Sequence, residues 1–276
     1  MLVALAVSTP AAGAAPKVPA FGHVVVVVFE NHEVNDVLGT SDAPTFNALA
    51  HRYASIDNYF AITHPSLPNY LALVSGSTQG ITNDCTDCTA PGRSLADTLE
   101  AARKSWKTYA EGFPSPGFDG GTSGRYAKKH NPFMYFPSVV SNPARLSRVV
   151  AFPQFAADVR AHRLPTFSLV VPDLCNDMHD CSVATGDTWL KQQIVPLLGS
   201  AGLARSVVFV IFDEGSSDTG GGGQVTALAL GPLVKPGSHF KAPTSHYGLL
   251  RTIETGLGLP LLGASRTAKP IVGIWR

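Results

Sequence analysis

Two apolar runs in this 276-residue chain each end in a pair of adjacent side chains that carry oxygen. The runs are HVVVVVF (23–29) and SVVFVIF (206–212), followed by Glu30 with Asn31 and by Asp213 with Glu214. Continuous runs of Val, Ile and Phe are typical of strands buried on both faces of a parallel sheet. Ligands bind beyond the carboxyl ends of such strands, so these side chains are expected to converge on one edge. Three carboxylates and an amide oxygen predict a divalent cation there, although acids after strands also cap helices or solvate loops.

Ser66 is the candidate nucleophile. It lies in THPSLPNYLALVSG (63–76), at a turn just before a predicted helix. The amide groups of a helix N-terminus favour an alkoxide or a bound phosphate at that point. On frequency alone, a serine in this position is more often only the N-cap of the helix. A cation at the same edge of the sheet would lower the pKa of the hydroxyl and make Ser66 a nucleophile.

A dense polar cluster follows another predicted strand at 166–171. The segment PDLCNDMHDC (172–181) includes Asp177 and His179 and should reach the same edge. His179 could contact phosphate oxygens, protonate a leaving group or complete a metal shell, whereas a lone histidine is more often structural.

Basic residues gather in RYAKKHNPF (125–133), which includes Lys129 and His130. Solvated surface charge is the default interpretation, and a mobile clamp over an anionic substrate is the alternative. His246 begins the last predicted helix and could orient other groups, with a structural role weighed equally. The GGGG run at 220–223 precedes a strand and lacks a P-loop lysine, so it is interpreted as a flexible turn.

Helical and strand patterns alternate along the chain. Helices are predicted at 44–54, 67–76, 94–104, 152–163, 186–198 and 245–257, and strands at 23–29, 56–62, 106–110, 166–171, 206–212 and 225–231. Residues 112–150 are rich in Gly, Pro and Ser and are expected to form a long insertion over the site. The pattern predicts an α/β fold, with a doubly wound, mostly parallel sheet sandwiched by helices, as one domain over residues 21–276.

Composition limits the classes of partner and the compartment. Charged residues make up 15% of the chain and the formal net charge is +1, which argues against a nucleic-acid partner. Residues 1–20 resemble the remnant of a secretory signal, and no segment is long enough to anchor the chain in a membrane, so a secreted protein is expected. The sequence does not indicate an oligomeric state. In an exported protein the cysteines favour two local disulfides, Cys85 with Cys88 and Cys175 with Cys181, over a zinc site of four thiolates.

Five motifs in this order resemble one known family: ENHE, HPSLPNYLALVSG, NDMHD, FDEG and SHYGLLRTIE. They are similar to the bacterial phosphoesterase family of acid phosphatases and phospholipases C, a branch of the alkaline-phosphatase-like superfamily. The similarity covers nearly the whole chain from about residue 20. It implies a metal bound by Glu30, Asn31, Ser66, Asp213 and Glu214, with catalysis by Ser66, His130 and His179 and a further contact from Asp177. With Lys129 and His246 from the analysis above, Asp177 completes the set of residues expected to bind substrate. Glu214 departs from the family pattern, since larger relatives carry an aspartate there.

The resemblance implies a secreted phosphomonoesterase that works through a phosphoserine, with a phosphoinositide as the specific substrate expected. One divalent metal ion is implied, and oxygen ligands favour magnesium, calcium or manganese. The chain lacks the C-terminal region of the larger phospholipases, which favours monoesters over diesters. Two alternatives stay open at this stage: a phospholipase C acting on a lipid headgroup, and a secreted binding module that holds a cation only structurally.

Overall fold

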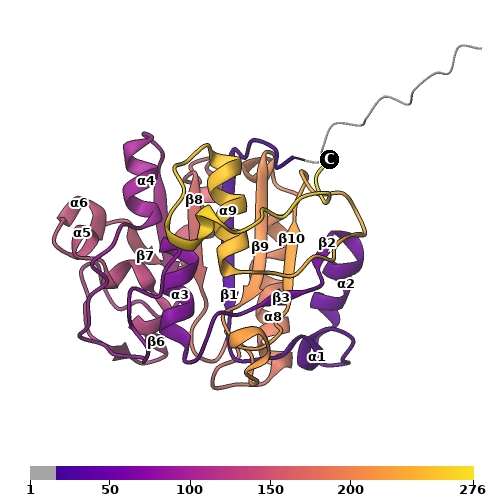
Figure 1. The fold of residues 1–276 in the computed structure, drawn as a ribbon, viewed down its shortest axis with the longest axis horizontal. Helices are drawn as coiled ribbons and strands as arrows, with labels where there is room; N and C mark the ends of the chain where they lie inside the picture. Colours follow the sequence, from indigo (N-terminus) through magenta and orange to yellow (C-terminus); the bar gives the residue numbers. More distant parts are fainter. Residues whose placement is uncertain (1–16) are drawn as a thin grey trace, which may run out of the picture.

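The apolar runs of the sequence become the central strands of an eight-stranded sheet (Figure 1). The computed structural model describes residues 17–276, so most of the predicted signal segment at 1–20 lies outside the described residues. The strand order is β11-β2-β10-β9-β1-β8-β4-β7. The strands are β1 His23–Phe29, β2 Ala54–Ile56, β4 Trp106–Ala110, β7 Val149–Ala151, β8 Phe167–Val171, β9 Ser206–Phe212, β10 Ala227–Leu230 and β11 Ser238–Phe240.

The sheet is mostly parallel, as predicted. Strand β10 runs antiparallel to its neighbours β9 and β2, and the other five pairs of adjacent strands are parallel. Every side chain of β9 is buried, and so is every side chain of β1 except that of His23. Burial on both faces explains why these strands read as unbroken apolar runs rather than as alternating patterns.

Helices cover both faces of this sheet. Helices α3 and α9 lie in front of the sheet in Figure 1, and α8 lies behind it. The helices are α1 Val34–Val37, α2 Pro44–Arg52, α3 Ser66–Ser75, α4 Leu95–Ala101, α5 Pro137–Val140, α6 Pro143–Leu146, α7 Pro153–Arg160, α8 Val183–Gln193 and α9 His246–Leu257. With helices on both faces, the α/β fold expected from the sequence is confirmed.

One prediction of local structure is wrong, and one alternative is excluded. The expected strand at 56–62 is split: β2 ends at Ile56, and β3 (Tyr59–Phe60) pairs with β12 (Thr244–Ser245) in a separate small sheet. Ser66 is not an N-cap, because it is the first residue of α3 and the capping position belongs to Pro65.

The predicted insertion at 112–150 is an ordered part of the domain. It contains the hairpin of β5 (Thr122–Ser123) and β6 (Tyr126–Ala127), two short 3₁₀ helices at Lys128–His130 and Pro132–Tyr135, α5, α6 and the edge strand β7. Lys128 and His130 are 5% and 1% exposed, so these two side chains are not the solvated surface charge that the sequence suggested.

Both predicted disulfides are present, Cys85 with Cys88 and Cys175 with Cys181. The alternative of a four-thiolate zinc site is therefore wrong. Within residues 17–276, no helix has the length and apolar character needed to cross a lipid bilayer.

Candidate active site

The register of two neighbouring strands brings the two oxygen-bearing pairs together. Strands β1 and β9 pair in parallel, with Phe29 opposite Phe212, so both strands end at the same level. The backbone N–H of Asp213 donates to the Phe29 carbonyl over 2.9 Å. The N–H of Asn31 lies 3.4 Å from Asp213 Oδ1. The edge predicted from the sequence therefore exists in the structure, and Glu30 and Asp213 leave adjacent strands on it.

Ser66 lies between acids from both strands. Its hydroxyl is placed to donate to Glu30 Oε2 over 3.0 Å and to Glu214 Oε1 over 3.2 Å, and the serine is 1% exposed. Asn69, one helical turn further on, holds the loop before the serine: its Oδ1 accepts from the N–H of Ile62, and its Nδ2 donates to the Thr63 carbonyl. The candidate nucleophile thus stands at the start of α3 on a loop braced by its own helix.

A glycine run packs against the same loop. Gly221 has φ 118°, and a Cβ added there would lie 2.3 Å from the Ile62 carbonyl oxygen. Gly222 approaches the Thr63 carbonyl just as closely, with a Cβ placed 2.4 Å away. These glycines therefore have a packing role, because they allow the turn at 220–223 to lie against the backbone of the loop that precedes Ser66.

Buried negative charge is the main electrostatic feature of the edge. Burial, reinforced by repulsion from neighbouring acids, raises the pKa values of Glu30 and Asp213 well above those of ordinary carboxyls. Burial also raises the pKa of Asp177 to about 8. Asp213 Oδ2 is buried and has no hydrogen-bond partner among the described residues. An acid cluster with an unpaired, inward oxygen has the donor chemistry that a hard divalent cation requires.

Tyr70 and His130 meet the other oxygen of the Glu30 carboxylate, Oε1. The Tyr70 hydroxyl donates to Glu30 Oε1 over 2.5 Å, and its ring stacks on the His130 imidazole at 5.3 Å. His130 Nε2 lies 3.2 Å from Glu30 Oε1, and Nδ1 lies 3.1 Å from Asp177 Oδ2. Burial, aided by the Lys129 charge, holds the pKa of His130 well below that of a free histidine. His130 is therefore buried between two acids, and each of its ring nitrogens faces a carboxylate oxygen.

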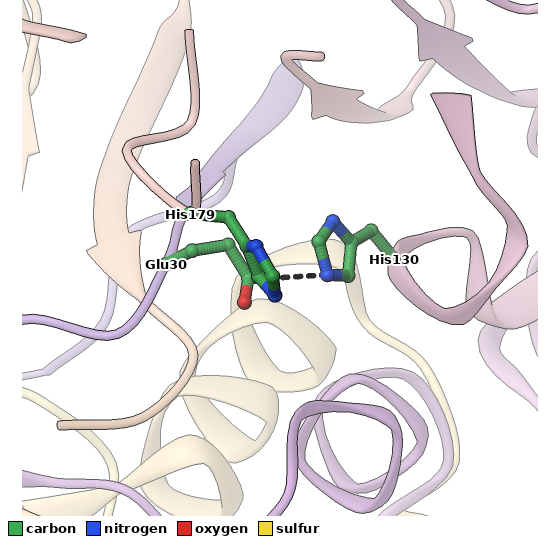
Figure 2. Close-up of side chains that lie close together, drawn as sticks. All are labelled: Glu30, His130 and His179. Atoms are coloured by element: carbon green, nitrogen blue, oxygen red, sulfur yellow. Dashed lines mark ion pairs between the residues drawn. The ribbon is translucent and has the colours of Figure 1, made fainter. Parts of the chain in front are cut away.

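A second group of possible metal ligands shares Glu30. One ligand atom each from Glu30, His130 and His179 lies within 4.8 Å of the other two (Figure 2). Figure 2 shows the two imidazoles and the carboxylate pointing toward a common centre. This group differs from the oxygen set expected from the sequence, because it offers two nitrogens and one oxygen. Glu30 lies between the two groups and can serve either.

Lys129 and His179 form a hydrogen-bonded pair beside these acids. Lys129 Nζ donates to Asp84 Oδ2 over 2.9 Å and to His179 Nε2 over 3.2 Å. Burial lowers the pKa of Lys129, but its bond and charge interaction with Asp84 outweigh that effect and raise it. An ammonium has no acceptor, so His179 Nε2 accepts and Nδ1–H donates to Asp180 Oδ1 at 2.7 Å. The structure therefore brings a fixed cation to the acid cluster.

The NDMHD loop joins this cluster through its backbone. The carbonyl of Asp177 accepts from the N–H of Glu30 over 2.9 Å, and Asp177 Oδ1 accepts from the N–H of His179 over 2.8 Å. The Cys175–Cys181 disulfide closes the loop around both residues. Asp177 is fully buried, so its geometry suits a support for Glu30 and His179 better than the substrate contact expected from the resemblance.

His246 has a supporting role as well. It is 1% exposed, its Nε2 lies 2.6 Å from the Asp213 carbonyl oxygen, and its Nδ1 lies 2.8 Å from the Tyr59 hydroxyl. Because a carbonyl only accepts, Nε2–H donates to it and Nδ1 accepts from the tyrosine. Both ring nitrogens are occupied, so the geometry of His246 suits a support for the backbone of Asp213 better than a contact with substrate.

Three residues near the acids were missed in the sequence. They are His64, Tyr70 and Asp84. Tyr70 follows Ser66 by four residues, so helical spacing alone puts both on one face of α3 and could have revealed it. Asp84 Oδ1 accepts from the N–H of Leu67 over 2.9 Å and thereby caps α3 from a distant loop. Nothing local predicts that contact, or the one that His64 makes with Glu214.

Comparison with known proteins gives a family match and several relatives. A model of the Phosphoesterase family matches residues 40–260. The phosphatidylinositol-3-phosphatase of Mycobacterium tuberculosis is 38% identical over 263 residues, covering 95% of this chain and 85% of that protein. The phosphate-repressible acid phosphatase of Penicillium chrysogenum is 31% identical over 227 residues, covering 78% of this chain. The chain spans only 54% of that fungal protein's length.

Solved structures share the architecture at low sequence identity. A protein of the alkaline phosphatase superfamily from Vibrio parahaemolyticus aligns with a TM-score of 0.64 at 14% identity, covering 93% of this chain and 72% of that one. Murine ectonucleotide pyrophosphatase/phosphodiesterase 5 aligns with a TM-score of 0.60 at 12% identity, covering 91% of this chain and all of that one. These structures show the fold alone. The family match over residues 40–260 and the 38% identity to a mycobacterial phosphatase establish that the chain belongs to the phosphoesterase family of hydrolases acting on phosphoric ester bonds.

Proposed function

We propose that the chain is a secreted, metal-dependent phosphomonoesterase that forms a phosphoserine at Ser66. The observation that carries this proposal is the position of the Ser66 hydroxyl, within hydrogen-bonding distance of Glu30 and Glu214 at the edge where β1 and β9 end. A serine used only for capping does not need two buried acids at its hydroxyl. The two disulfides favour an oxidising compartment, which supports secretion.

The residues at this edge fit a divalent cation. Glu30, Asn31, Asp213, Glu214 and the Ser66 hydroxyl would hold it, and an all-oxygen set favours magnesium, calcium or manganese. The buried Asp213 Oδ2, which has no hydrogen-bond partner among the described residues, and the buried Glu30 carboxylate beside it support this assignment. When bound, the cation would lower the pKa of the serine hydroxyl and neutralise charge on phosphate oxygens. His130 and His179 provide a second, nitrogen-containing set around the same Glu30.

Ser66, Lys129 and His179 would each carry out a different step of the hydrolysis. Ser66 Oγ forms a bond to phosphorus as the bond to the ester oxygen breaks, and the hydroxyl proton passes to one of the two carboxylates beside it, Glu30 or Glu214. Lys129 donates to the equatorial phosphate oxygens, where positioning and charge neutralisation supply most of the catalysis in phosphoryl transfer. His179 Nε2 shares a proton of Lys129, so this pair can protonate the leaving group. Water then hydrolyses the phosphoserine and releases phosphate.

Similarity to relatives favours monoesters as substrates. The mycobacterial relative is named for its action on a phosphoinositide, and the fungal relatives are named acid phosphatases. Lys129 adds a cation suited to a doubly charged terminal phosphate. We therefore expect a chromogenic phosphomonoester and phosphatidylinositol 3-phosphate to be cleaved faster than phosphatidylcholine. Faster cleavage of phosphatidylcholine would favour a phospholipase C instead.

Substitution of Ser66 tests the nucleophile directly. Ser66→Ala is expected to lower kcat by about 10³-fold or more, with the melting temperature and phosphate binding retained, because only the covalent step is lost. Exhaustive chelation should also abolish turnover, and added divalent cation should restore it. Ser75→Ala is a matched control, since this buried serine at the other end of α3 bonds only to backbone carbonyls and to Gln79. More than a few per cent activity in Ser66→Ala would refute the assignment of the nucleophile.

A further inference from the structure

His64 connects the nucleophile loop to the acid that follows β9. It stands two residues before Ser66, and its Nδ1 lies 2.7 Å from Glu214 Oε2. The other oxygen of the same carboxylate, Oε1, accepts from the Ser66 hydroxyl over 3.2 Å. One carboxylate is therefore held at both oxygens by residues of a single short loop. Fixing Oε2 determines the direction in which Oε1 points.

The second ring nitrogen of His64 is also engaged. Nε2 lies 3.0 Å from the carbonyl oxygen of Ser217, in the loop that follows Glu214. That loop is itself fixed by Glu33, whose Oε1 accepts from the N–H groups of Ser216 and Ser217 over 3.1 and 2.9 Å. The imidazole is thus clamped between a rigid backbone segment and the Glu214 side chain. Its ring cannot turn without breaking one of these contacts.

We propose that His64 is a positioning residue that holds the Glu214 carboxylate in the orientation required to bind the divalent cation and to face Ser66. This inference rests on the proposed metal-dependent function. Glu214 is 5% exposed and shares its edge with Glu30 and Asp213, so without a donor its carboxylate would be driven away by like charge. Partners outside the ligand shell that orient ligating carboxylates usually change metal affinity or activity by about 10- to 100-fold.

Two substitutions separate the contacts of His64. The Nδ2 group of asparagine reaches the position of His Nδ1, so His64→Asn keeps a donor toward Glu214 and loses the one toward Ser217. The Nε2 group of glutamine reaches the position of His Nε2, so His64→Gln keeps the donor toward Ser217 and loses the one toward Glu214. Both variants are uncharged and similar in size. A difference between them reports the Glu214 contact rather than the charge or volume of the histidine.

A matched control lies at the far edge of the sheet. His239 on β11 is placed to donate from Nδ1 to Asp57 Oδ1 over 2.9 Å, in a histidine–carboxylate pair of the same kind. His239→Gln removes that donor as His64→Gln removes the other, but away from the acids that surround Ser66. We expect His239→Gln to bind divalent cations as the wild type does.

The experiment measures cation binding without turnover. Chelated protein is titrated calorimetrically with Mn²⁺ alone, and melting temperatures with and without Mn²⁺ confirm that each variant folds. We expect His64→Gln to bind Mn²⁺ about 10- to 100-fold more weakly than the wild type, and His64→Asn to stay close to it. Equal Mn²⁺ affinities in the wild type and His64→Gln, or equal losses of affinity in both His64 variants, would overturn the positioning role of His64. Either result would leave the proposed metal-dependent function standing. Absence of Mn²⁺ binding in the wild type would overturn both the metal-dependent function and this inference.

Discussion

Removal of a single hydroxyl, in Tyr70→Phe, tests whether the Glu30 carboxylate must be held at Oε1, the oxygen that Ser66 does not contact. The Tyr70 hydroxyl donates to Glu30 Oε1 over 2.5 Å at a fully buried position. The tyrosine ring also stacks on His130 with an angle of 11° between the planes. Phenylalanine keeps the ring and its stacking, so the substitution isolates the hydrogen bond.

The size of the effect follows from the charge of the acceptor. A hydrogen bond to a charged group contributes roughly 1.5–3 kcal/mol, and its loss from a buried site leaves the carboxylate underpaired. If Glu30 must keep this orientation in the transition state, that free energy corresponds to a decrease in kcat/KM of about 10- to 100-fold. The affinity for a divalent cation should fall in the same direction, because the Glu30 carboxylate becomes free to rotate.

Tyr135→Phe is the matched control for this experiment. Tyr135 is as deeply buried as Tyr70, but its hydroxyl has no hydrogen-bond partner among the described residues. Deleting it should leave kcat/KM unchanged and leave the melting temperature the same or higher, since an unpaired buried hydroxyl costs about 1–3 kcal/mol. Kinetics with a chromogenic phosphomonoester and thermal melts of both variants provide the comparison. Wild-type kcat/KM in Tyr70→Phe, or an equal loss in Tyr135→Phe, would refute the reasoning.

Three further perturbations are independent of this hydrogen bond. Lys129→Met should raise the inhibition constant of inorganic phosphate by about tenfold or more, because a charge-assisted hydrogen-bond donor is lost. An unchanged inhibition constant would show that Lys129 does not bind the phosphate. Burial raises the pKa of Glu254 to about 7. The folded state therefore holds a proton that the unfolded chain releases above about pH 4.3. The free energy of unfolding should then fall by about 1.4 kcal/mol per pH unit as the pH rises toward 7. Denaturant titrations of Glu254→Gln should show a free energy of unfolding that depends less on pH between pH 5 and 7 than that of the wild type. In the Cys175→Ser/Cys181→Ser double variant, the free energy of unfolding should fall by only about 2 kcal/mol. Its kcat should fall by up to about a hundredfold, because the loop that places His179 loosens. Wild-type kinetics in this variant would show that the disulfide is not needed for the site.

The strands and the acids after them could be predicted because their signals are local. A run of seven apolar residues identifies a strand buried on both faces, and parallel strands put their carboxyl ends at one edge. The convergence of Glu30 and Asp213 follows from these two facts without knowledge of any loop. The sequence does not predict that the two strands are adjacent in the sheet. The structure shows that β1 and β9 pair directly.

The misread residues depend on contacts between distant segments. Lys128 and His130 look like part of a solvated basic run, yet their 3₁₀ helix packs on α3 and buries both side chains. His64 and Asp84 act through partners 150 and 17 residues away, Glu214 and Leu67. Such pairs have no periodicity and no fixed spacing, so only the folded chain reveals them.

The pairing of Phe29 with Phe212 sets the spacing of the candidate ligands by the geometry of the sheet alone. Neighbouring strands lie about 4.8 Å apart whatever connects them. Lengthening the connections between strands therefore leaves Glu30 and Asp213 in place. It changes only which side chains from those connections contact the two acids. The segment at 112–150, which delivers Lys129 and His130, is one such connection. In a fold of this kind, changes in the connecting segments can alter the residues around the acids and the phosphate esters that fit there. The positions of the acids themselves stay fixed by the sheet.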